Sequence, residues 1–172
     1  AAEYRTSFEE SHGFGWRTTD PPSLDWSALK QNRAQEITRL NGVYEDLLTN
    51  AGVRLLRGRA TLEDAHTVVV NGERLCAERL LIATGGWPAV PEIVGHDLVV
   101  TSNEMFDLDP FPARLLVVGG GYIACEFASI FNGLGSRVTQ LYRGAQVLRG
   151  FDDDVRRFLS AEMVKAGVDL RL

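Results

Sequence analysis

The sequence predicts an α/β fold, and three patterns lead to that prediction. Residues 115–118 are four aliphatic side chains in a row, typical of a strand buried on both faces, and a glycine-rich turn follows directly. A helix, a second strand at residues 137–142 and a second helix then follow in the order of an α/β unit. Earlier in the chain, Asn71-Gly72 is the strongest hairpin signal and predicts an antiparallel part.

Composition limits the classes of protein that fit the chain. With 172 residues and 45% apolar content, it is long enough to bury one good core or two small ones. The formal charge of -5 argues against a general nucleic-acid surface, and no membrane span is predicted. Cys76 and Cys125 lie far apart and form no metal-ligand pattern, which favours a reducing, cytoplasmic setting. Both cysteines are expected to be small buried hydrophobic residues.

The two ends of the chain indicate a longer protein. Residues 1–10 already have the pattern of a helix and include no initiating methionine. At the other end, a helix over residues 152–165 stops at Gly167, and residues 168–172 have the pattern of a strand that has just begun. We therefore expect the chain to be a piece of a longer protein, and we expect this piece to start inside a helix.

The first half of the chain predicts a loop, one long helix and a small meander. Glycines and prolines mark residues 11–23 as a loop. Asp25 suits the N-cap of an amphipathic helix that runs to Ala51-Gly52, with an irregularity expected at Asn41-Gly42. Short strand-like runs follow at residues 53–57, 59–62, 67–70 and 74–77.

A connecting region joins this half to the aliphatic strand. Residues 79–84 predict a buried strand that ends at the turn Gly85-Gly86-Trp87-Pro88. Residues 95–112 are expected to lead onward through one short helix at residues 103–106, capped by Ser102. The connection delivers the chain to the strand that precedes the glycine-rich turn.

The glycine-rich turn has the pattern of a dinucleotide-binding fingerprint, Gly119-x-Gly121-x-x-Ala124. Gly119 permits the tight turn, Gly121 has no side chain to block a pyrophosphate, and the small Ala124 lets the helix pack close to the strand. The amides and the positive end of that helix then hold the phosphates. The position of the motif between a strand and a helix makes an ordinary turn the weaker interpretation.

The end of the second strand decides between the two dinucleotides, because a carboxylate there holds the ribose hydroxyls of NAD and repels a phosphate. Here Arg143 follows that strand, and Arg149 comes six residues later. Guanidinium groups suit a dianionic 2'-phosphate, since they offer planar, permanently charged donors. The alternative is a pair of solvated surface arginines. Their place beside the fingerprint favours NADPH over NADH.

Further motifs are spread along the whole chain: Leu40-Asn41-Gly42-Val43-Tyr44, Ala83-Thr84-Gly85-Gly86-Trp87-Pro88, Gly119-Gly120-Gly121-Tyr122-Ile123-Ala124-Cys125-Glu126, Tyr142-Arg143, and Leu148-Arg149-Gly150-Phe151-Asp152. Together they resemble the FAD-dependent pyridine nucleotide disulfide oxidoreductases. Within that family the resemblance is to the enzymes that reduce oxidised glutathione.

The resemblance implies a fold of two Rossmann-like (three-layer) nucleotide-binding domains, both incomplete, with an antiparallel β insert in the first. Residues 1–84 are implied to be the C-terminal-side part of the FAD-binding domain. Residues 85–112 are implied to be a connecting segment, and residues 113–172 the first half of the NADPH-binding domain.

The resemblance also implies a set of NADP-binding residues on and after the glycine turn: Gly119, Gly120, Gly121, Tyr122, Ile123, Ala124, Glu126, Arg143 and Arg149. Tyr122 is implied to cover the flavin ring and to swing aside for the nicotinamide, and Glu126 to lie near the nicotinamide. On the residues alone, Tyr122 is equally a packing aromatic, and Glu126 is equally a first-turn acid favoured by the helix dipole.

For FAD, the resemblance implies contacts from Ala60 and from Thr84 and Gly85, where small residues let backbone approach a ligand closely. Tyr44 matches an aromatic residue at the site of the disulfide substrate. On the residues alone, Thr84 and Gly85 are equally a plain strand-ending turn, and Tyr44 is equally a core residue of its helix.

The implied reaction passes electrons from NADPH through FAD and a redox-active disulfide to oxidised glutathione, in a homodimer. The disulfide, the first FAD-binding glycine motif and a C-terminal His-Glu pair have no counterpart in these residues, so no catalytic residue is predicted among them. No metal ligands are predicted, because His12, His66 and His96 are scattered. Two alternatives stay open: a non-catalytic nucleotide-binding remnant, and a related reductase for thioredoxin, trypanothione or mercuric ion.

Overall fold

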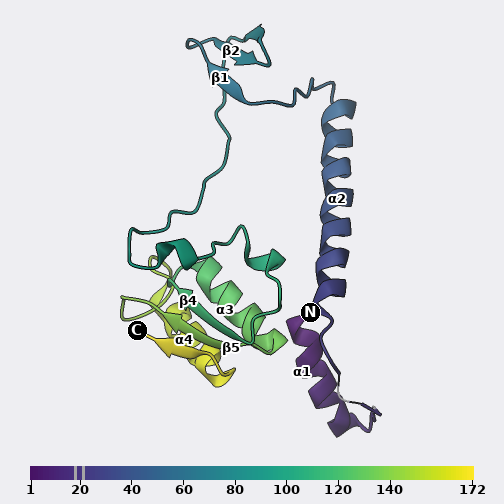
Figure 1. The fold of residues 1–172 in the computed structure, drawn as a ribbon, viewed down its shortest axis with the longest axis vertical. Coiled ribbons are helices and arrows are strands. Elements are labelled where there is room, and N and C mark those ends of the chain that lie inside the picture. Colours follow the sequence, from purple (N-terminus) through teal and green to yellow (C-terminus); the bar gives the residue numbers. More distant parts are fainter. Residues whose placement is uncertain (18, 21) are drawn as a thin grey trace. The chain divides into compact units, whose positions relative to one another are not determined.

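The structure is a computed structural model that describes residues 1–17, 19–20 and 22–172 (Figure 1). Thr18 and Pro21, which belong to the predicted loop at residues 11–23, lie outside the described residues. The chain divides into two compact units, and each is described by itself. One unit combines Ala1–Trp26 with Val100–Leu172, and the other is Ser27–Val99. Within the described ranges, no helix combines the length and the apolar character that crossing a bilayer requires.

The first unit contains a parallel sheet with its crossover helices. The strands β4 (Arg114–Val118), β5 (Arg137–Leu141) and β6 (Asp169–Arg171) lie in the order β4-β5-β6, and both pairs are parallel. The helix α3 (Tyr122–Leu134) connects β4 to β5, and α4 (Asp153–Lys165) connects β5 to β6 (Figure 1). This βαβαβ arrangement matches one half of a doubly wound sheet, so the predicted incomplete Rossmann-like α/β fold is confirmed.

Only one face of this sheet is covered. Right-handed crossovers place successive helices on the same face of a parallel sheet, and on that face Val138 and Gln140 are 1% and 0% exposed. Leu116 and Val118 belong to the opposite face, where they are 58% and 74% exposed. The prediction that the aliphatic strand is buried on both faces is therefore wrong for the second face. In the described residues no second helical layer covers it.

An aromatic cluster anchors α3. The ring of Phe131 is fully buried and stacks on Phe111 at 5.8 Å between centroids, and Trp26 lies edge-on to Phe111 at 5.3 Å. The indole Nε1 of Trp26 donates a hydrogen bond to the carbonyl oxygen of Leu108 at 2.7 Å. Each such aromatic pair contributes about 0.5–1.5 kcal/mol beyond the burial of its area. The cluster therefore fixes the approach of the connecting segment to α3.

The predicted N-terminal helix is present as α1 (Ala2–Ser11), followed by the 3-10 turn η1 (His12–Phe14). Within its unit, α1 lies against α3 at Gly133, where a Cβ would come within 2.7 Å of the Ala2 side chain. The absence of a side chain at Gly133 is what lets the two helices approach.

The connecting segment contains two short 3-10 turns, η2 (His96–Leu98) and η3 (Met105–Asp107). In place of the helix predicted at residues 103–106, the structure has the three-residue turn η3, which begins two residues later and is not capped by Ser102. Instead Glu104 Oε2 accepts hydrogen bonds from the amide and the hydroxyl of Thr101, each at 2.7 Å. The amide of Glu104 in turn donates to the carbonyl oxygen of Thr101 at 3.1 Å. This exchange of bonds resembles a capping box that begins at Thr101, one residue before the predicted cap.

The second unit contains most of the long helix α2 (Trp26–Asn50). The helix is continuous through Asn41-Gly42, so the irregularity expected there is not formed. Its apolar stripe is exposed, with Ile37 50%, Tyr44 64% and Leu47 59% accessible. The helix itself was therefore predicted correctly. Within the described residues of this unit, however, nothing packs against its apolar stripe.

The antiparallel part of the second unit is confirmed as β1 (Ala60–Leu62), β2 (Thr67–Val70) and β3 (Glu73–Cys76), in the order β1-β2-β3. Between β2 and β3 the two turn residues Asn71 and Gly72 have φ of 50° and 83°, and Val70 pairs with Glu73. Positive φ at both positions is what a two-residue hairpin of this kind requires.

Two predicted strands are not formed. Residues 53–57 and 79–84 have extended or irregular backbone without strand pairing, and Leu81 and Ile82 are 90% and 68% exposed. A strand is defined by hydrogen bonds to a neighbour, and an apolar run alone does not supply one. Within the described part of the chain, no strand pairs with either run.

Candidate functional site

The glycine turn lies at the carboxyl end of β4, where open α/β sheets bind their ligands. Gly119 has φ 142°, and its amide donates to the carbonyl oxygen of Leu141 in β5 at 2.9 Å. A Cβ at Gly119 would lie 3.4 Å from the Cβ of Ala124, so the turn and the helix are in close contact. Gly121 is the N-cap of α3, provides no side-chain cap, and faces open space. The first-turn amides of α3 are therefore available to an anion.

Gly120 connects this turn to the segment after β5. A Cβ at Gly120 would overlap the ring of Tyr142, so glycine is required there by packing within the protein. The carbonyl oxygen of Gly120 accepts a hydrogen bond from the amide of Leu148 at 2.5 Å. Sequence reasoning had assigned Gly120 to ligand contact and missed Tyr142, whose partner is 22 residues away and cannot be read from local spacing.

We call residues 143–149 the arginine loop. The residue before the loop, Tyr142, packs its ring against Gly120. Near the end of the loop, the amide of Leu148 donates a hydrogen bond to the Gly120 carbonyl oxygen. Arg143 and Arg149 are both exposed and each directly follows a residue in contact with Gly120. The structure thus brings the residues that precede the two predicted arginines into contact with the glycine turn.

The arginine loop is also held from α4. The guanidinium of Arg156 donates from Nε to the carbonyl oxygen of Val147 at 2.9 Å and from Nη2 to that of Gln146 at 3.2 Å. Its Nη1 pairs with Asp153 at 2.8 Å, and the side chain is only 20% exposed. Sequence reasoning missed Arg156, since its spacing from Asp153 predicts only an ordinary ion pair along a helix.

A buried polar side chain supports the turn from below. Gln140 is 0% exposed, and its Nε2 donates to the carbonyl oxygen of Gly119 at 2.9 Å and contacts the Cys125 sulfur at 3.6 Å. Among the described residues, its Oε1 has no hydrogen-bond partner. Burial raises the pKa of the Cys125 thiol, the neighbouring Glu126 charge raises it further, and the bond from Gln140 acts in the opposite direction. Cys125 is therefore a neutral structural thiol, as predicted.

The second cysteine differs from its prediction. Cys76 was expected to be a small buried hydrophobic residue, and it is exposed on β3. Its sulfur lies 3.7 Å from the Thr67 hydroxyl across the hairpin. The strand β3 is exposed along most of its length, and only Leu75 is partly buried.

The remaining predicted nucleotide contacts lie on the first turns of α3. Tyr122 and Ile123 are 59% and 43% exposed, and Glu126 is exposed one turn later. In the described residues the Tyr122 ring is thus not a packing aromatic. All three side chains belong to the same helix end as the glycine turn.

The residues predicted for FAD and for the disulfide substrate belong to the other unit. Ala60 begins β1, and Thr84 and Gly85 are exposed in an extended segment, with Gly85 at φ 75° and open space around it. Tyr44 is 64% exposed on α2, so in the described residues it is not a core residue.

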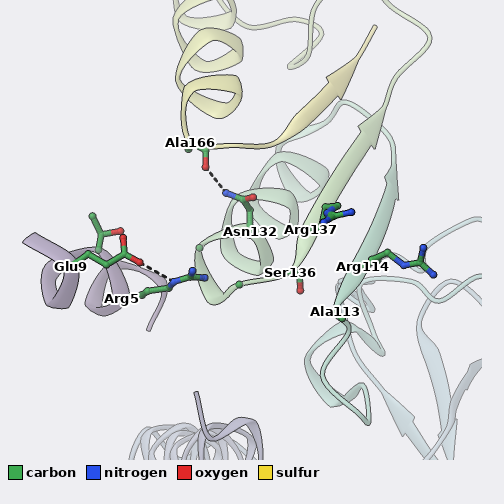
Figure 2. Close-up of a pocket in the computed structure, with 11 residues that line it drawn as sticks. Arg5, Glu9, Ala113, Arg114, Asn132, Ser136, Arg137 and Ala166 are labelled. Carbon is green, nitrogen blue, oxygen red and sulfur yellow. Dashed lines mark hydrogen bonds and ion pairs between the residues drawn. The ribbon is translucent and has the colours of Figure 1, made fainter. Parts of the chain in front are cut away.

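The described residues also form a cavity of about 600 Å³ at the amino ends of β4 and β5 (Figure 2). Figure 2 shows Arg5 of α1 paired with Glu9, while Arg114 and Arg137 extend away from that pair. This cavity is at the end of the strands opposite the glycine turn, and none of the predicted site residues lines it.

The histidines have structural contacts. In each, Nδ1 lies within 3.2 Å of a backbone carbonyl oxygen, and the pairs are His12 with Phe8, His66 with Ala77 and His96 with Ile93. Across the described ranges, no three histidine, cysteine or acidic side chains gather into a group able to hold a metal ion.

The family model for pyridine nucleotide-disulphide oxidoreductases matches residues 5–172. The chain therefore belongs to the pyridine nucleotide-disulphide oxidoreductase family, and the resemblance inferred from its motifs is confirmed.

Within the family, the similar curated proteins include glutathione reductases. The chain is 48% identical to glutathione reductase of Burkholderia cepacia over 172 residues, which is 100% of this chain and 38% of that protein. It is 47% identical to the chloroplastic/mitochondrial glutathione reductase of Pisum sativum, over 89% of this chain and 28% of that one. Trypanothione reductase of Leishmania donovani is 40% identical over 99% of this chain and 38% of its own length.

A solved structure agrees with these matches. The Cu(II) complex of the HOCl-induced flavoprotein disulfide reductase RclA from Escherichia coli has a TM-score of 0.75 at 28% identity. The match covers 87% of this chain and 35% of that one. The chain thus spans less than two fifths of the length of the relatives it matches.

Proposed function

We propose that this chain is part of an NADPH-dependent flavin disulfide reductase that reduces oxidised glutathione. The observation that supports the proposal is the arginine loop, because Tyr142 and Leu148, which directly precede Arg143 and Arg149 in the chain, both contact Gly120 of the glycine turn. Glutathione reductases and flavoprotein disulfide reductases use FAD and NADPH, and glutathione reductases are prominent among the relatives. Because the chain spans 38% of such a relative, the activity belongs to the longer protein.

The residues fit an NADP molecule. Nothing lies within 4 Å of a Cβ built at Gly121, so a pyrophosphate has room to approach the first-turn amides of α3. The proposed contacts are Gly119, Gly120, Gly121, Tyr122, Ile123, Ala124, Glu126, Arg143 and Arg149. Arg143 and Arg149 bind the 2'-phosphate through charge-assisted hydrogen bonds, which distinguish it from the free hydroxyl of NAD.

The chain's own residues position the cofactors. With the cofactors bound, Tyr122 would cover the flavin ring and swing aside for the nicotinamide, and the Glu126 carboxylate would lie near the nicotinamide. Ala60, Thr84 and Gly85 hold FAD through backbone contacts, for which the open space at Gly85 gives room. When bound, NADPH and FAD supply hydride and electron transfer to a disulfide. Tyr44 contacts the disulfide substrate.

The remaining assignments follow the same proposal. Residues 1–84 form part of the FAD-binding domain, residues 85–112 connect the domains, and residues 113–172 form the first half of the NADPH-binding domain. The full protein is a homodimer. Its compartment is the reducing cytoplasm, which the two free cysteines support, although the relative from Pisum sativum is named chloroplastic/mitochondrial.

The test is a disulfide-reductase assay of the full-length protein. Oxidation of NADPH is followed in parallel with oxidised glutathione, trypanothione disulfide and oxidised thioredoxin. We expect turnover with oxidised glutathione and little with the other two. Preferential turnover of trypanothione disulfide would favour the second candidate, which the 40% identity to a trypanothione reductase motivates. No turnover with any disulfide would favour a non-catalytic nucleotide-binding protein.

A further inference from the structure

We propose that Arg156 sets the affinity for the 2'-phosphate of NADP without touching it, as a positioning residue that holds the arginine loop. The inference rests on the proposed function, because it concerns the same dinucleotide site. Arg156 lies on α4, seven residues after Arg149, and its guanidinium donates hydrogen bonds to other groups of the protein.

The contacts of Arg156 fall on the middle of the arginine loop. Its two donors reach the carbonyl oxygens of Gln146 and Val147, which lie between Arg143 and Arg149 in the chain. Two parallel donors on one planar group fix both the position and the orientation of their acceptors. The ion pair with Asp153 holds the guanidinium itself on the first turn of α4.

The loop requires such support because it has no regular secondary structure of its own. Leu148 adopts φ 55°, a left-handed conformation that is unfavourable for a residue with a branched side chain. Its neighbour Val147 is fully buried, and the Leu148 amide reaches Gly120. Strained backbone of this kind persists only where surrounding contacts hold it, and Arg156 supplies two of them.

The same geometry separates Arg156 from a direct phosphate ligand. Arg156 is 20% exposed and paired with Asp153, whereas Arg143 and Arg149 are exposed. Arg157, the next residue, is a matched control: it pairs with Asp154 on the same helix and is 60% exposed, and within the described residues no hydrogen bond joins it to the loop.

The experiment measures binding of NADP⁺ and NAD⁺ to the full-length protein by calorimetry, without turnover. We expect Arg156→Ala to weaken NADP⁺ about tenfold, the coupling typical of members of one hydrogen-bond network, and to leave NAD⁺ within about twofold. Arg157→Ala should change neither. Arg156→Lys keeps the charge but cannot bridge both carbonyls, so it should behave like Arg156→Ala.

A double-mutant comparison separates positioning from direct contact. In a protein that already carries Arg143→Ala and Arg149→Ala, the Arg156→Ala change should cost no further NADP⁺ affinity, because the groups it positions are gone. A further tenfold loss would show direct phosphate contact and overturn the proposal. Equal losses of NADP⁺ and NAD⁺, or full affinity in Arg156→Lys, would also overturn it.

The two proposals fail differently. If the unmodified protein binds NAD⁺ as tightly as NADP⁺, the proposed cofactor preference fails and the role of Arg156 fails with it. If the unmodified protein prefers NADP⁺ and Arg156→Ala keeps that preference, only the role of Arg156 fails. Should Arg156→Ala not fold, Arg156→Lys gives the same comparison.

Discussion

Arg143 and Arg149 are the residues on which the cofactor assignment depends. Replacing both with Ala should raise the KM for NADPH about a hundredfold, since each charge-assisted hydrogen bond is worth roughly a factor of ten or more. The KM for NADH should stay within about twofold, because its ribose carries no phosphate. Steady-state kinetics of the full-length protein checks this, and equal losses for both dinucleotides would contradict it.

Gln140 is the buried side chain on which the glycine turn rests. Gln140→Glu replaces the amide donor to the Gly119 carbonyl with a carboxyl group, which must either bury a charge or take up a proton in a site that is 0% exposed. A buried polar group without partners costs several kcal/mol, so we expect a loss of about 3 kcal/mol in the free energy of unfolding. Urea denaturation measures it.

Gln140→Leu is the matched control. It loses the same hydrogen bond but also removes the unpartnered Oε1, so its cost should be about 1 kcal/mol. Equal stability of the Leu and Glu variants would contradict the view that a buried carboxyl group is the damaging element.

The two thiols should react at very different rates. The thiolate is the reactive form, and burial raises the pKa of Cys125 above its ordinary value of 9.0. At pH 8 iodoacetamide should label Cys76 in the folded protein and spare Cys125 until denaturant is added. Peptide mapping by mass spectrometry distinguishes the two. Comparable labelling of Cys125 in the folded protein would contradict its structural role.

For single residues, the sequence predicts the roles that depend on neighbouring residues, but it does not predict contacts with residues that are distant in the chain. Gly119, Gly121 and Ala124 follow from the needs of one turn, and the structure gives each the expected geometry. Tyr142 and Arg156 act through contacts with backbone that folding brings to them, and no spacing rule marks those contacts.

Among the elements, η3 depends on the turn between Thr101 and Glu104. Two bonds from Thr101 lower the pKa of the Glu104 carboxyl from its ordinary value of 4.5. A lowered folded-state pKa gives stabilisation that is complete above the ordinary value and is lost as the pH falls through the folded-state pKa.

Thr101→Val, which removes the hydroxyl donor, should therefore raise the titration midpoint of Glu104 towards 4.5. Carboxyl-detected NMR titration with assigned Glu104 measures the shift. Thr101→Ser keeps the hydroxyl and serves as control. An unchanged midpoint in the Val variant would show that the hydroxyl bond is not what lowers the pKa.

Elements marked by strong turn residues or by a clear order of strand and helix patterns were predicted correctly, whereas two apolar runs that find no partner strand in the described residues were not. The Asn71-Gly72 hairpin and the order of β4, α3, β5, α4 and β6 follow from turn residues and periodicity. The apolar run at residues 79–84 has the composition of a strand, but its state depends on a neighbouring strand that its own residues do not specify. Pattern establishes propensity, while pairing decides structure.

For the whole molecule, the open face of the parallel sheet is the main feature. Leu116 and Val118 expose apolar surface there, and exposed apolar patches promote association. We expect the 172-residue chain, expressed alone, to self-associate through this face. Replacing Leu116 and Val118 with Lys should shift it towards monomer in light scattering, whereas Val155→Lys on α4 should not. Association unchanged by the double substitution would place the contact elsewhere.

The contact of Gly120 with both Tyr142 and Leu148 has a consequence for re-engineering cofactor choice. The turn that we propose to bind the pyrophosphate and the loop that we propose to bind the 2'-phosphate share one backbone position, so neither can be exchanged without affecting the other. Transplanting the loop of an NAD-dependent relative between residues 143 and 149 would bring new side chains, and a loop of different backbone geometry would move the residue 148 amide away from the Gly120 carbonyl. A graft that keeps Tyr142, Gly120 and the backbone geometry of residue 148 preserves the contacts that hold the loop against the turn, whether the loop residues favour NADP or NAD.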